Sequence, residues 1–366
     1  MPKLLVVTND FPPTIGGIQS YVRDFLAQLP AEDIVVFAST QDAQAARAWD
    51  AHAGYQVVRY PHRIMLPSPD VAAQMKKLVA EHNIDTVWFP SAAPLALLAH
   101  SLTGVRVVAS THGHEVGWSM FPGGRSVLRS IGTRCDAVTY ISDYTLGRLQ
   151  RPFGAAAMWV HLPSGVDASA YRRPPARPRQ AYGLHDGPVV LCIARLVPRK
   201  GQDQLLKVWP RILQRFPDAQ LVIVGEGSYE KRLRELADGL AGVVFTGRVT
   251  DEARTDLLLL SDIFAMPART RGKGLDVEGL GIVYLEAQAA GLPVIAGDSG
   301  GAPETVTPDT GLVVSGRSSD ALEAALVKLL ANPSLREKLG RAGRNYVSEQ
   351  WTWEQLGTEF RRTLFT

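Results

Sequence analysis

Short apolar runs rich in β-branched residues alternate with amphipathic stretches along the whole chain. In the first half, six such runs predict buried strands, at residues 4–7, 34–37, 57–60, 86–89, 105–109 and 137–141. A second series of six follows, at residues 189–194, 220–224, 243–246, 263–266, 294–296 and 312–314. Helical periodicity is clearest between the early runs, at residues 18–28 and 71–82. Strands of this kind alternating with helices are typical of parallel sheets covered on both faces.

The two series of runs predict two doubly wound α/β domains. A proline-rich, basic stretch at residues 171–178 lies between them. Because proline fixes φ and restricts the residue before it, we expect this stretch to be a semi-rigid linker. We therefore predict an N-terminal domain over residues 1–167 and a C-terminal domain over residues 168–351.

The end of the chain carries a separate helical pattern. Apolar residues recur at helical spacing in this segment, at Trp353, Leu356, Phe360 and Leu364. The spacing predicts an amphipathic helix over residues 352–366 that docks on one of the domains. The pattern alone does not say which domain it covers, and the N-terminal one is our first candidate.

Composition and charge exclude several classes of protein. Of the 366 residues, 46% are hydrophobic and 20% charged, which argues for well-packed cores and against disorder. The 39 basic and 36 acidic residues are spread evenly, so no general nucleic-acid binder is expected. Cys135 and Cys192 lie in different halves, which excludes a disulfide framework and a zinc site. The longest apolar region, residues 87–99, is broken by prolines, so we expect a cytoplasmic protein, soluble or peripheral, with no membrane span.

A glycine pair, Gly16-Gly17, follows the first predicted strand and precedes a predicted helix. Glycines let the backbone approach a ligand closely, and the amides of a helix N-terminus favour phosphate. The alternative is an ordinary tight turn. The surrounding residues lack the G-x-G-x-x-G spacing of dinucleotide-binding enzymes, which weakens the hypothesis of a dehydrogenase.

Two histidines, His112 and His114, follow the predicted strand at residues 105–109. Their spacing does not match the i, i+4 arrangement of helical metal ligands, and there is no cysteine cluster nearby. One alternative is a loop histidine without a function. The position at the carboxyl end of a strand favours an imidazole that faces a ligand.

Two cations, Arg195 and Lys200, lie between the first strand of the second series and the helix that follows it. Two positive charges and the free amides of a helix N-terminus would then meet at one place, which favours a diphosphate. The alternative is a solvated basic loop.

Two carboxylates, Glu278 and Glu286, are separated by seven residues. A glycine-rich turn between them opens a predicted helix, with the amides of residues 281–283 at its start. Such a segment offers carboxylates for sugar hydroxyls and amide donors for phosphate.

Taken together with residues 163–167 (Pro-Ser-Gly-Val-Asp), these motifs resemble those of the retaining glycosyltransferases of family four. The resemblance covers essentially the whole chain. It implies the GT-B fold, in which two doubly wound Rossmann-like domains face each other across a cleft. The resemblance is closer still to phosphatidylinositol mannosyltransferases of the PimB type, through residues 8–13, 111–118 and 266–271.

The resemblance implies a role for each site residue. Arg195 and Lys200 are expected to hold the donor phosphates, and Glu278 the hydroxyls of the donor sugar. With His112 near that sugar, or less favourably His114, these residues form the expected catalytic set. Glu286 is expected to contact the ribose. The remaining expected substrate-binding residues are Asp10, Gly16, Gly17, Gln19, Arg248, Val249, Gly279, Leu280, Gly281, Ile282 and Val283.

The resemblance also implies a reaction. A retaining mannosyltransferase of this type moves mannose from GDP-mannose to the inositol 6-hydroxyl of phosphatidylinositol monomannoside, giving the α-1,6-linked dimannoside. The N-terminal domain would bind the acceptor and the C-terminal domain the nucleotide sugar. Two alternatives stay open: another lipid or a soluble sugar as acceptor, and a nucleotide-sugar epimerase. No cofactor or metal is expected, because Arg195 and Lys200 can neutralise the departing diphosphate.

Two stretches mix basic with large apolar residues and lack acids. Between residues 115 and 136 they include Arg125, Arg129 and Arg134, and between residues 70 and 81 they include Met75, Lys76 and Lys77. This pattern suits an anionic lipid surface, here the inner face of the plasma membrane. The alternative is ordinary amphipathic helices packed on a sheet. The expected partners are thus a nucleotide sugar, a phosphatidylinositol-type lipid and an anionic membrane, and no nucleic acid.

Overall fold

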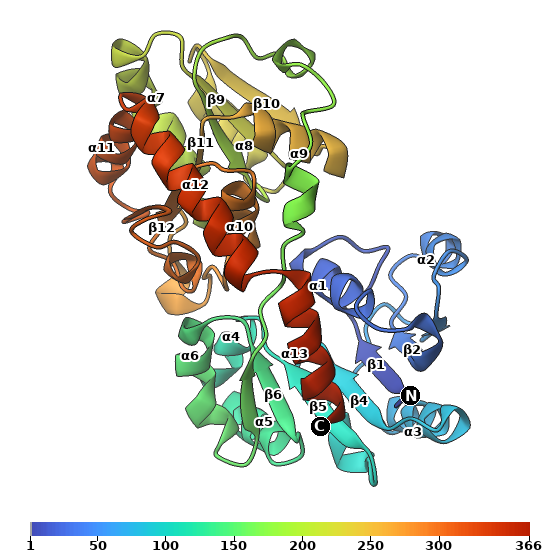
Figure 1. Cartoon of the computed structure of the whole chain (residues 1–366). Coiled ribbons are helices and arrows are strands. Elements are labelled where there is room, and N and C mark those ends of the chain that lie inside the picture. Colours follow the sequence, from blue (N-terminus) through green and yellow to red (C-terminus); the bar gives the residue numbers. More distant parts are fainter. Residues whose placement is uncertain (1) are drawn as a thin grey trace. The chain divides into compact units, whose positions relative to one another are not determined.

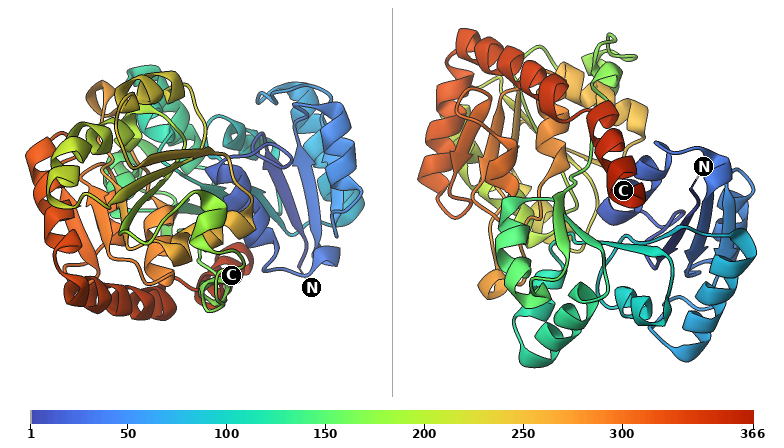
Figure 2. Two further views of the ribbon diagram at one scale, coloured as in Figure 1. Left: turned by 90° about the horizontal axis from the view of Figure 1, so that it is seen from above. Right: turned by 60° about the horizontal axis from the view of Figure 1, so that its bottom comes forward.

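A computed structural model describes residues 2–366 and divides the chain into two compact units. Unit 1 comprises the chain up to Ser164 together with Trp353–Thr366, and unit 2 comprises Gly165–Thr352. These bounds lie within three residues of the expected ones. Both units are doubly wound, as predicted, with helices on both faces of a sheet (Figure 1 and Figure 2). That the two units face each other across a cleft stays a prediction.

Unit 1 contains a seven-stranded parallel sheet in the order β3-β2-β1-β4-β5-β6-β7. Its strands are β1 (Leu4–Thr8), β2 (Ile34–Ala38), β3 (Gln56–Arg59), β4 (Thr86–Phe89), β5 (Arg106–Ser110), β6 (Ala137–Tyr140) and β7 (Met158–His161). The central strand β1 is buried along its whole length because helices cover both faces. The apolar runs predicted every strand except β7, an edge strand whose first and last residues are exposed.

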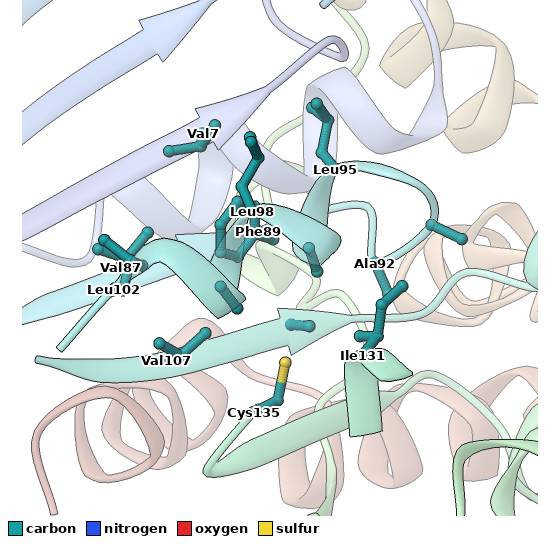
Figure 3. Packing of buried hydrophobic residues seen from close by; sticks show 14 of the residues in the cluster. Val7, Val87, Phe89, Ala92, Leu95, Leu98, Leu102, Val107, Ile131 and Cys135 are labelled. Carbon is teal, nitrogen blue, oxygen red and sulfur yellow. The ribbon is translucent and has the colours of Figure 1, made fainter. Parts of the chain in front are cut away.

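The helices of unit 1 are α1 (Gly17–Leu26), α2 (Ala43–Asp50), α3 (Pro69–His82), α4 (Glu115–Ser119), α5 (Pro122–Gly132), α6 (Asp143–Phe153) and α13 (Trp353–Phe365). Between sheet and helices lies a dry core, in which strand residues such as Val87 and Phe89 pack with Leu98 and Ile131 (Figure 3). In α3, Met75 is fully buried in this core. The apolar side of α3 therefore packs on the sheet, the second of the two alternatives considered for that stretch.

The last helix, α13, packs on unit 1. The Phe360 ring lies 4.7 Å from that of Phe25 and 4.8 Å from that of Trp88. Thr86 Oγ1 donates a 2.8 Å hydrogen bond to the carbonyl of Leu364. The apolar face predicted from the sequence is thus buried against α1 and β4.

Unit 2 contains a six-stranded parallel sheet in the order β10-β9-β8-β11-β12-β13. Its strands are β8 (Val189–Ile193), β9 (Gln220–Val224), β10 (Val243–Gly247), β11 (Ile263–Met266), β12 (Val294–Gly297) and β13 (Gly311–Val314). Each corresponds to a predicted run. The chain leaves β8 toward β9 on one side and returns to β11 on the other, so the strand order reverses between β8 and β11. Ligands bind at such reversals, outside the carboxyl ends of the strands.

The helices of unit 2 are α7 (Gln202–Arg215), α8 (Glu230–Ala237), α9 (Asp251–Leu260), α10 (Ile282–Ala289), α11 (Ser319–Leu330) and α12 (Pro333–Gln350). Of all the helices formed by residues 2–366, none combines the length and the apolar character needed to cross a membrane.

The proline-rich stretch at residues 171–178 is not a linker between the two units, which corrects the prediction of a semi-rigid linker. It belongs to unit 2, where the fully buried carboxylate of Asp256 on α9 holds it. Asp256 accepts hydrogen bonds from the amides of Ala176 and Arg177 at 2.8 and 3.0 Å. It also accepts one from the Tyr182 hydroxyl and pairs with Arg173 at 3.0 Å. Composition alone indicated a linker, but this clamp ties the stretch to α9.

Both cysteines are buried and free, as expected for inert thiols. Burial raises the pKa of Cys135 and that of Cys192 to about 12.

Candidate active site

The predicted site residues fall into two groups, one in each unit, and both follow the carboxyl ends of strands. The group in unit 2 contains the cations after β8, the residues after β10 and the E-x7-E segment that opens α10. The group in unit 1 contains the loop after β1 and the histidines after β5.

In unit 2 the structure brings Lys200 and Glu278 together. Lys200 Nζ lies 2.7 Å from Glu278 Oε2, and both side chains are about nine-tenths buried. At this distance the contact is an ion pair, although that oxygen makes no hydrogen bond of ordinary geometry with any described residue. Arg195, which is exposed, also acts on Glu278 electrostatically. Lys200 and Glu278, which were predicted from two separate motifs, are therefore in direct contact at the strand reversal.

A further cation, Arg199, was not assigned a role from the sequence. Its Nε lies 3.9 Å from Glu278 Oε2 and 3.5 Å from Asp276 Oδ1, and donates to the carbonyl of Val277. Arg199 thus fixes the loop that carries Glu278. The only signal in the sequence was its position between Arg195 and Lys200, which did not separate it from a solvated charge.

The loop after β12 supports Glu278 from the other side. Ser299 Oγ accepts a 3.1 Å hydrogen bond from the amide of Glu278, and the Gly301 amide donates to the Glu278 carbonyl at 3.1 Å. Gly300 has φ +56°, and a Cβ there would collide with that same carbonyl. Sequence reasoning missed this loop, although the Ser-Gly-Gly run after a strand is a signal of close backbone approach.

The ionisation of Glu278 is coupled to this cluster. Burial acts to raise the pKa of Glu278, but Lys200 and Arg199 outweigh it and hold the pKa below its usual 4.5. A carboxylate with a depressed folded-state pKa contributes stability above its unfolded pKa, and this contribution is lost as pH falls through the folded value.

We therefore expect the stability difference between wild type and Glu278→Gln to depend on pH. It should be largest at neutral pH and shrink as pH falls below 4.5, where Glu278 of the unfolded chain takes up a proton, until the lower pKa of the folded protein is passed. Denaturant unfolding at neutral and acidic pH measures this difference. A difference that stays constant, or grows in acid, would contradict the ion pair.

The start of α10 presents unsatisfied amides at the same place. Gly281 precedes the helix with φ 90°, and no side chain caps it. The amides of Ile282 and Val283 have no intrahelical partner because they belong to the first turn. The residues expected to bind substrate, Gly279 to Val283, therefore place a positive helix end next to Lys200 and Glu278.

Glu286 lies further along α10 and does not join the Lys200 cluster. Its Oε1 forms a short ion pair with Arg254 of α9. The two other residues predicted to bind substrate, Arg248 and Val249, follow the edge strand β10, where Arg248 lies 3.4 Å from Glu226 and is exposed. Glu286 and Arg248 thus form ion pairs with partners other than Lys200 and Glu278.

In unit 1, Asp10 and Gln19 are bonded to each other beside Gly16. Gln19 Nε2 donates to Asp10 Oδ1 at 3.0 Å, and Ser91 Oγ donates to Asp10 Oδ2 at 2.9 Å. A Cβ at Gly16 would collide with Oε1 of Gln19, whereas Gly17 has open space around it. A side chain at Gly16 would thus displace Gln19, whereas a side chain at Gly17 would meet no neighbour.

Replacing Gly16 by Ala is expected to push the Gln19 side chain away from Asp10. Because Gln19 is flexible, the fold should keep most of its stability, while any activity that depends on Gln19 should fall at least about tenfold. Gly147→Ala in α6, where an added Cβ also meets open space, is the matched control and should be close to wild type. Steady-state kinetics of both variants measure the effect, and equal activity would show that the Gln19–Asp10 contact has no role.

His112 is the histidine that the structure holds in place. Its Nε2 lies 2.7 Å from the Pro90 carbonyl, which only accepts, so Nε2 carries the proton and Nδ1 is left as an acceptor. The ring packs edge-on against Tyr21 at 4.6 Å. Burial lowers the pKa of His112 below its usual 6.5, more than Glu115 raises it, so the ring is neutral at neutral pH.

His114 is in a different environment. It is exposed, and its Nε2 lies 3.2 Å from Glu115 Oε1. Glu115 is fully buried, and its other oxygen, Oε2, accepts a 3.0 Å hydrogen bond from the backbone amide of His112. The geometry therefore favours His112 over His114 as an oriented acceptor.

Unit 2 also contains a hollow of about 490 Å³ that none of the predicted site residues lines. Tyr171, Arg172, Leu259, Ala289 and Arg344 are among its lining residues. It lies at the carboxyl end of α10, whereas the charge cluster lies at the amino end. Within residues 2–366, no three His, Cys, Asp or Glu side chains gather as they would around a metal ion.

Comparison with known proteins shows the family of this chain. Residues 15–170 match the sequence model of "Glycosyltransferase Family 4", and residues 177–346 match that of "Glycosyl transferases group 1". The chain is 55% identical to the "GDP-mannose-dependent monoacylated alpha-(1-6)-phosphatidylinositol monomannoside mannosyltransferase" of Corynebacterium glutamicum, over 97% of this chain and 96% of the relative. It is 52% identical to the "GDP-mannose-dependent alpha-(1-6)-phosphatidylinositol monomannoside mannosyltransferase" of Mycobacterium tuberculosis, over 98% and 97%.

Solved structures agree on the fold. The sucrose-phosphate synthase of Thermosynechococcus elongatus superposes with a TM-score of 0.81 at 22% identity, covering 99% of this chain and 98% of that one. Anabaena HepE in complex with UDP superposes with a TM-score of 0.82 at 19% identity, covering 99% of both. Because both families and the named relatives are transferases, the epimerase considered from the sequence is set aside. The chain belongs to the family-four glycosyltransferases of GT-B fold.

Proposed function

We propose that this glycosyltransferase moves mannose from GDP-mannose to phosphatidylinositol monomannoside, forming an α-1,6 linkage. The observation that carries the proposal is identity of 55% and 52%, over nearly the full length, to relatives whose names state this donor and acceptor. The charges in unit 2 support it, because Lys200, Glu278 and the start of α10 suit a sugar joined to a diphosphate.

The reaction separates charge, and the residues of unit 2 oppose the charges that form. As the bond from the anomeric carbon to the diphosphate breaks, negative charge grows on the leaving group. Lys200, Arg195 and the amides of α10 stabilise it, each well-placed donor by about 2.7–4 kcal/mol. Glu278 accepts hydrogen bonds from hydroxyls of the mannose. These cations replace the neutralisation that a divalent metal would provide, so the proposed reaction uses no metal.

Retention of the anomeric configuration follows from a front-face reaction. The acceptor hydroxyl attacks from the side on which the diphosphate leaves, and the diphosphate oxygen takes the hydroxyl proton. His112, neutral and with Nδ1 as an acceptor, is assigned to a hydroxyl of the donor sugar. Asp10, Gly16 and Gln19 are assigned to the acceptor side in unit 1.

Donor and acceptor screening tests the proposed function. Purified protein is incubated with GDP-mannose, UDP-glucose or GDP-glucose, and with phosphatidylinositol monomannoside, phosphatidylinositol or free inositol phosphate. We expect a lipid product one hexose heavier only with GDP-mannose and the monomannoside, detected by mass spectrometry. Transfer to the soluble acceptor alone would replace the lipid proposal by the alternative acceptor class.

We also propose that unit 1 meets an anionic membrane surface, on the cytoplasmic side of the plasma membrane. The support lies at the junction of α4 and α5, where Met120 is 40% and Phe121 51% exposed. Arg125 and Arg129 of α5 are exposed next to them, and the apolar residues Leu128 and Ile131 face the core. Exposed apolar side chains beside arginines suit the interface of an anionic bilayer.

Replacing both Arg125 and Arg129 by Ser is expected to weaken binding to anionic vesicles by about 10- to 100-fold. Each arginine near the surface contributes about 1 kcal/mol, and salt screens this contribution. Vesicle co-sedimentation at low and high salt measures it. Lys76→Ser with Lys77→Ser in α3, whose apolar face is buried, is the matched control. Wild-type binding by the α5 double variant at low salt would refute the membrane contact.

A further inference from the structure

Two charged side chains from neighbouring helices of unit 2 pair outside the Lys200 cluster. Arg254 lies on α9, and its guanidinium forms a short ion pair with Oε1 of Glu286 on α10. The side chains are 29% and 15% exposed. The other oxygen of Glu286, Oε2, is buried and has no hydrogen-bond partner among the residues that the structure describes. Half of this carboxylate is therefore occupied and half is left for another donor.

The pair is largely buried. Tyr171 is buried beside it, and burial followed by the charge of Glu286 raises the pKa of its hydroxyl, so it stays neutral. Burial alone would lower the pKa of Arg254, but the charge of Glu286 and their hydrogen bond outweigh it and raise that pKa. The attraction between the two charges is thus stronger than the cost of burying the cation.

The position of Arg254 on α9 is not explained by its own helix. It lies at the fourth residue of a helix that begins at Asp251, where the positive end of the helix dipole disfavours a cation. Leu257 and Leu258 bury the inner face of α9, and Thr250 caps its first turn through the Ala253 amide. The contact that accounts for an arginine here is the one to Glu286.

We propose that Arg254 is a positioning residue for donor binding, which holds Oε1 of Glu286 so that Oε2 is presented to the ribose hydroxyls of the nucleotide. This inference rests on the proposed function and on the ribose contact that the family resemblance implies for Glu286. Without the guanidinium, the carboxylate would lose its cationic partner, and it would no longer be held in one orientation. The ribose would then bind to a group that must first be reorganised.

The test compares two nucleotides on matched variants. Calorimetric titration measures the dissociation constants of GDP and of 2′,3′-dideoxy-GDP for wild type, Arg254→Met, Arg254→Lys and Arg232→Met. Arg232 is the control because it forms an exposed ion pair with Glu235 on α8 of the same unit. Thermal unfolding of each variant, with and without GDP, shows whether the binding-competent fold is retained.

We expect Arg254→Met to bind GDP about tenfold or more weakly than wild type, and dideoxy-GDP almost equally well. The lysine variant should recover part of the loss because it keeps the charge, and Arg232→Met should bind both nucleotides like wild type. In kinetics with GDP-mannose, KM should rise more than kcat falls. If Arg254→Met weakens both nucleotides equally, or neither, the residue is structural and the proposal is overturned.

The outcome for the proposed function is separate. If wild type binds GDP and dideoxy-GDP equally, the ribose contact of Glu286 fails and this inference fails with it, while mannosyl transfer is measured independently on the lipid acceptor. If wild type and Arg254→Met bind the two nucleotides as expected but no mannose is transferred, the role of Arg254 stands. The assigned donor sugar or acceptor is then wrong. Should Arg254→Met not fold, the lysine variant and the same two nucleotides still give the comparison.

Discussion

Replacing Lys200 by Met is expected to lower kcat by about 10²- to 10³-fold, the usual effect of removing one preorganised charge from a developing oxyanion. Lys200 is the cation that the structure holds against Glu278, 2.7 Å away and almost fully buried. Its loss removes the charge that opposes the leaving diphosphate. Steady-state kinetics with GDP-mannose at saturating acceptor measures the change, and Lys207→Met, an exposed lysine on α7, is the matched control.

The Lys200→Met variant is also expected to be less stable than wild type. A carboxylate is left behind in the protein interior when Lys200 is removed. Breaking one partner of a buried pair costs about 3–5 kcal/mol. Lys200→Met with Glu278→Gln removes the unpaired charge and should recover part of that loss without recovering activity. Wild-type turnover in a folded Lys200→Met variant would refute the diphosphate role.

Replacing Asp256 by Ala is expected to lower the free energy of unfolding by about 3–5 kcal/mol. The carboxylate is fully buried and is the common acceptor for the amides of Ala176 and Arg177 and for the Tyr182 hydroxyl. Without it these donors and Arg173 lose their partner at once. Denaturant unfolding measures the loss.

Two variants sharpen the test of Asp256. Glu252→Ala removes an exposed acid from the same helix and should cost less than about 1 kcal/mol. Asp256→Asn keeps one acceptor oxygen and should lie between wild type and Asp256→Ala. A loss for Asp256→Ala no larger than that for Glu252→Ala would mean that the stretch at residues 171–178 is not anchored there.

The extent to which the sequence predicts the structure depends on how local each signal is. The strands of both sheets followed from continuous apolar runs, because strands buried on both faces admit little else. The edge strand β7 was not predicted because its ends, Met158 and His161, are exposed, so it has no continuous buried apolar run. The charges of Arg195, Lys200 and Glu278 were found because each follows a strand or opens a helix, and strand ends meet at one edge of a parallel sheet.

Contacts between distant segments were not predictable in this way. The clamp at Asp256 joins residues about 80 positions apart, so the prolines at residues 171–178 were interpreted as a semi-rigid linker. Arg254 meets Glu286 only because the fold brings the first turn of α9 within side-chain reach of α10, and periodicity cannot show this. In unit 1, Gln19 meets Asp10 only after α1 folds back over the end of β1.

The most direct test of the account is the product made from GDP-mannose and phosphatidylinositol monomannoside by the purified protein, with Lys200→Met in parallel. Mass spectrometry identifies the lipid, and NMR of the new glycosidic bond gives its position and anomeric configuration. The account predicts an α-1,6-linked dimannoside from wild type and at most a trace from the variant. A lipid of inverted configuration, or transfer that Lys200→Met leaves unchanged, would contradict it.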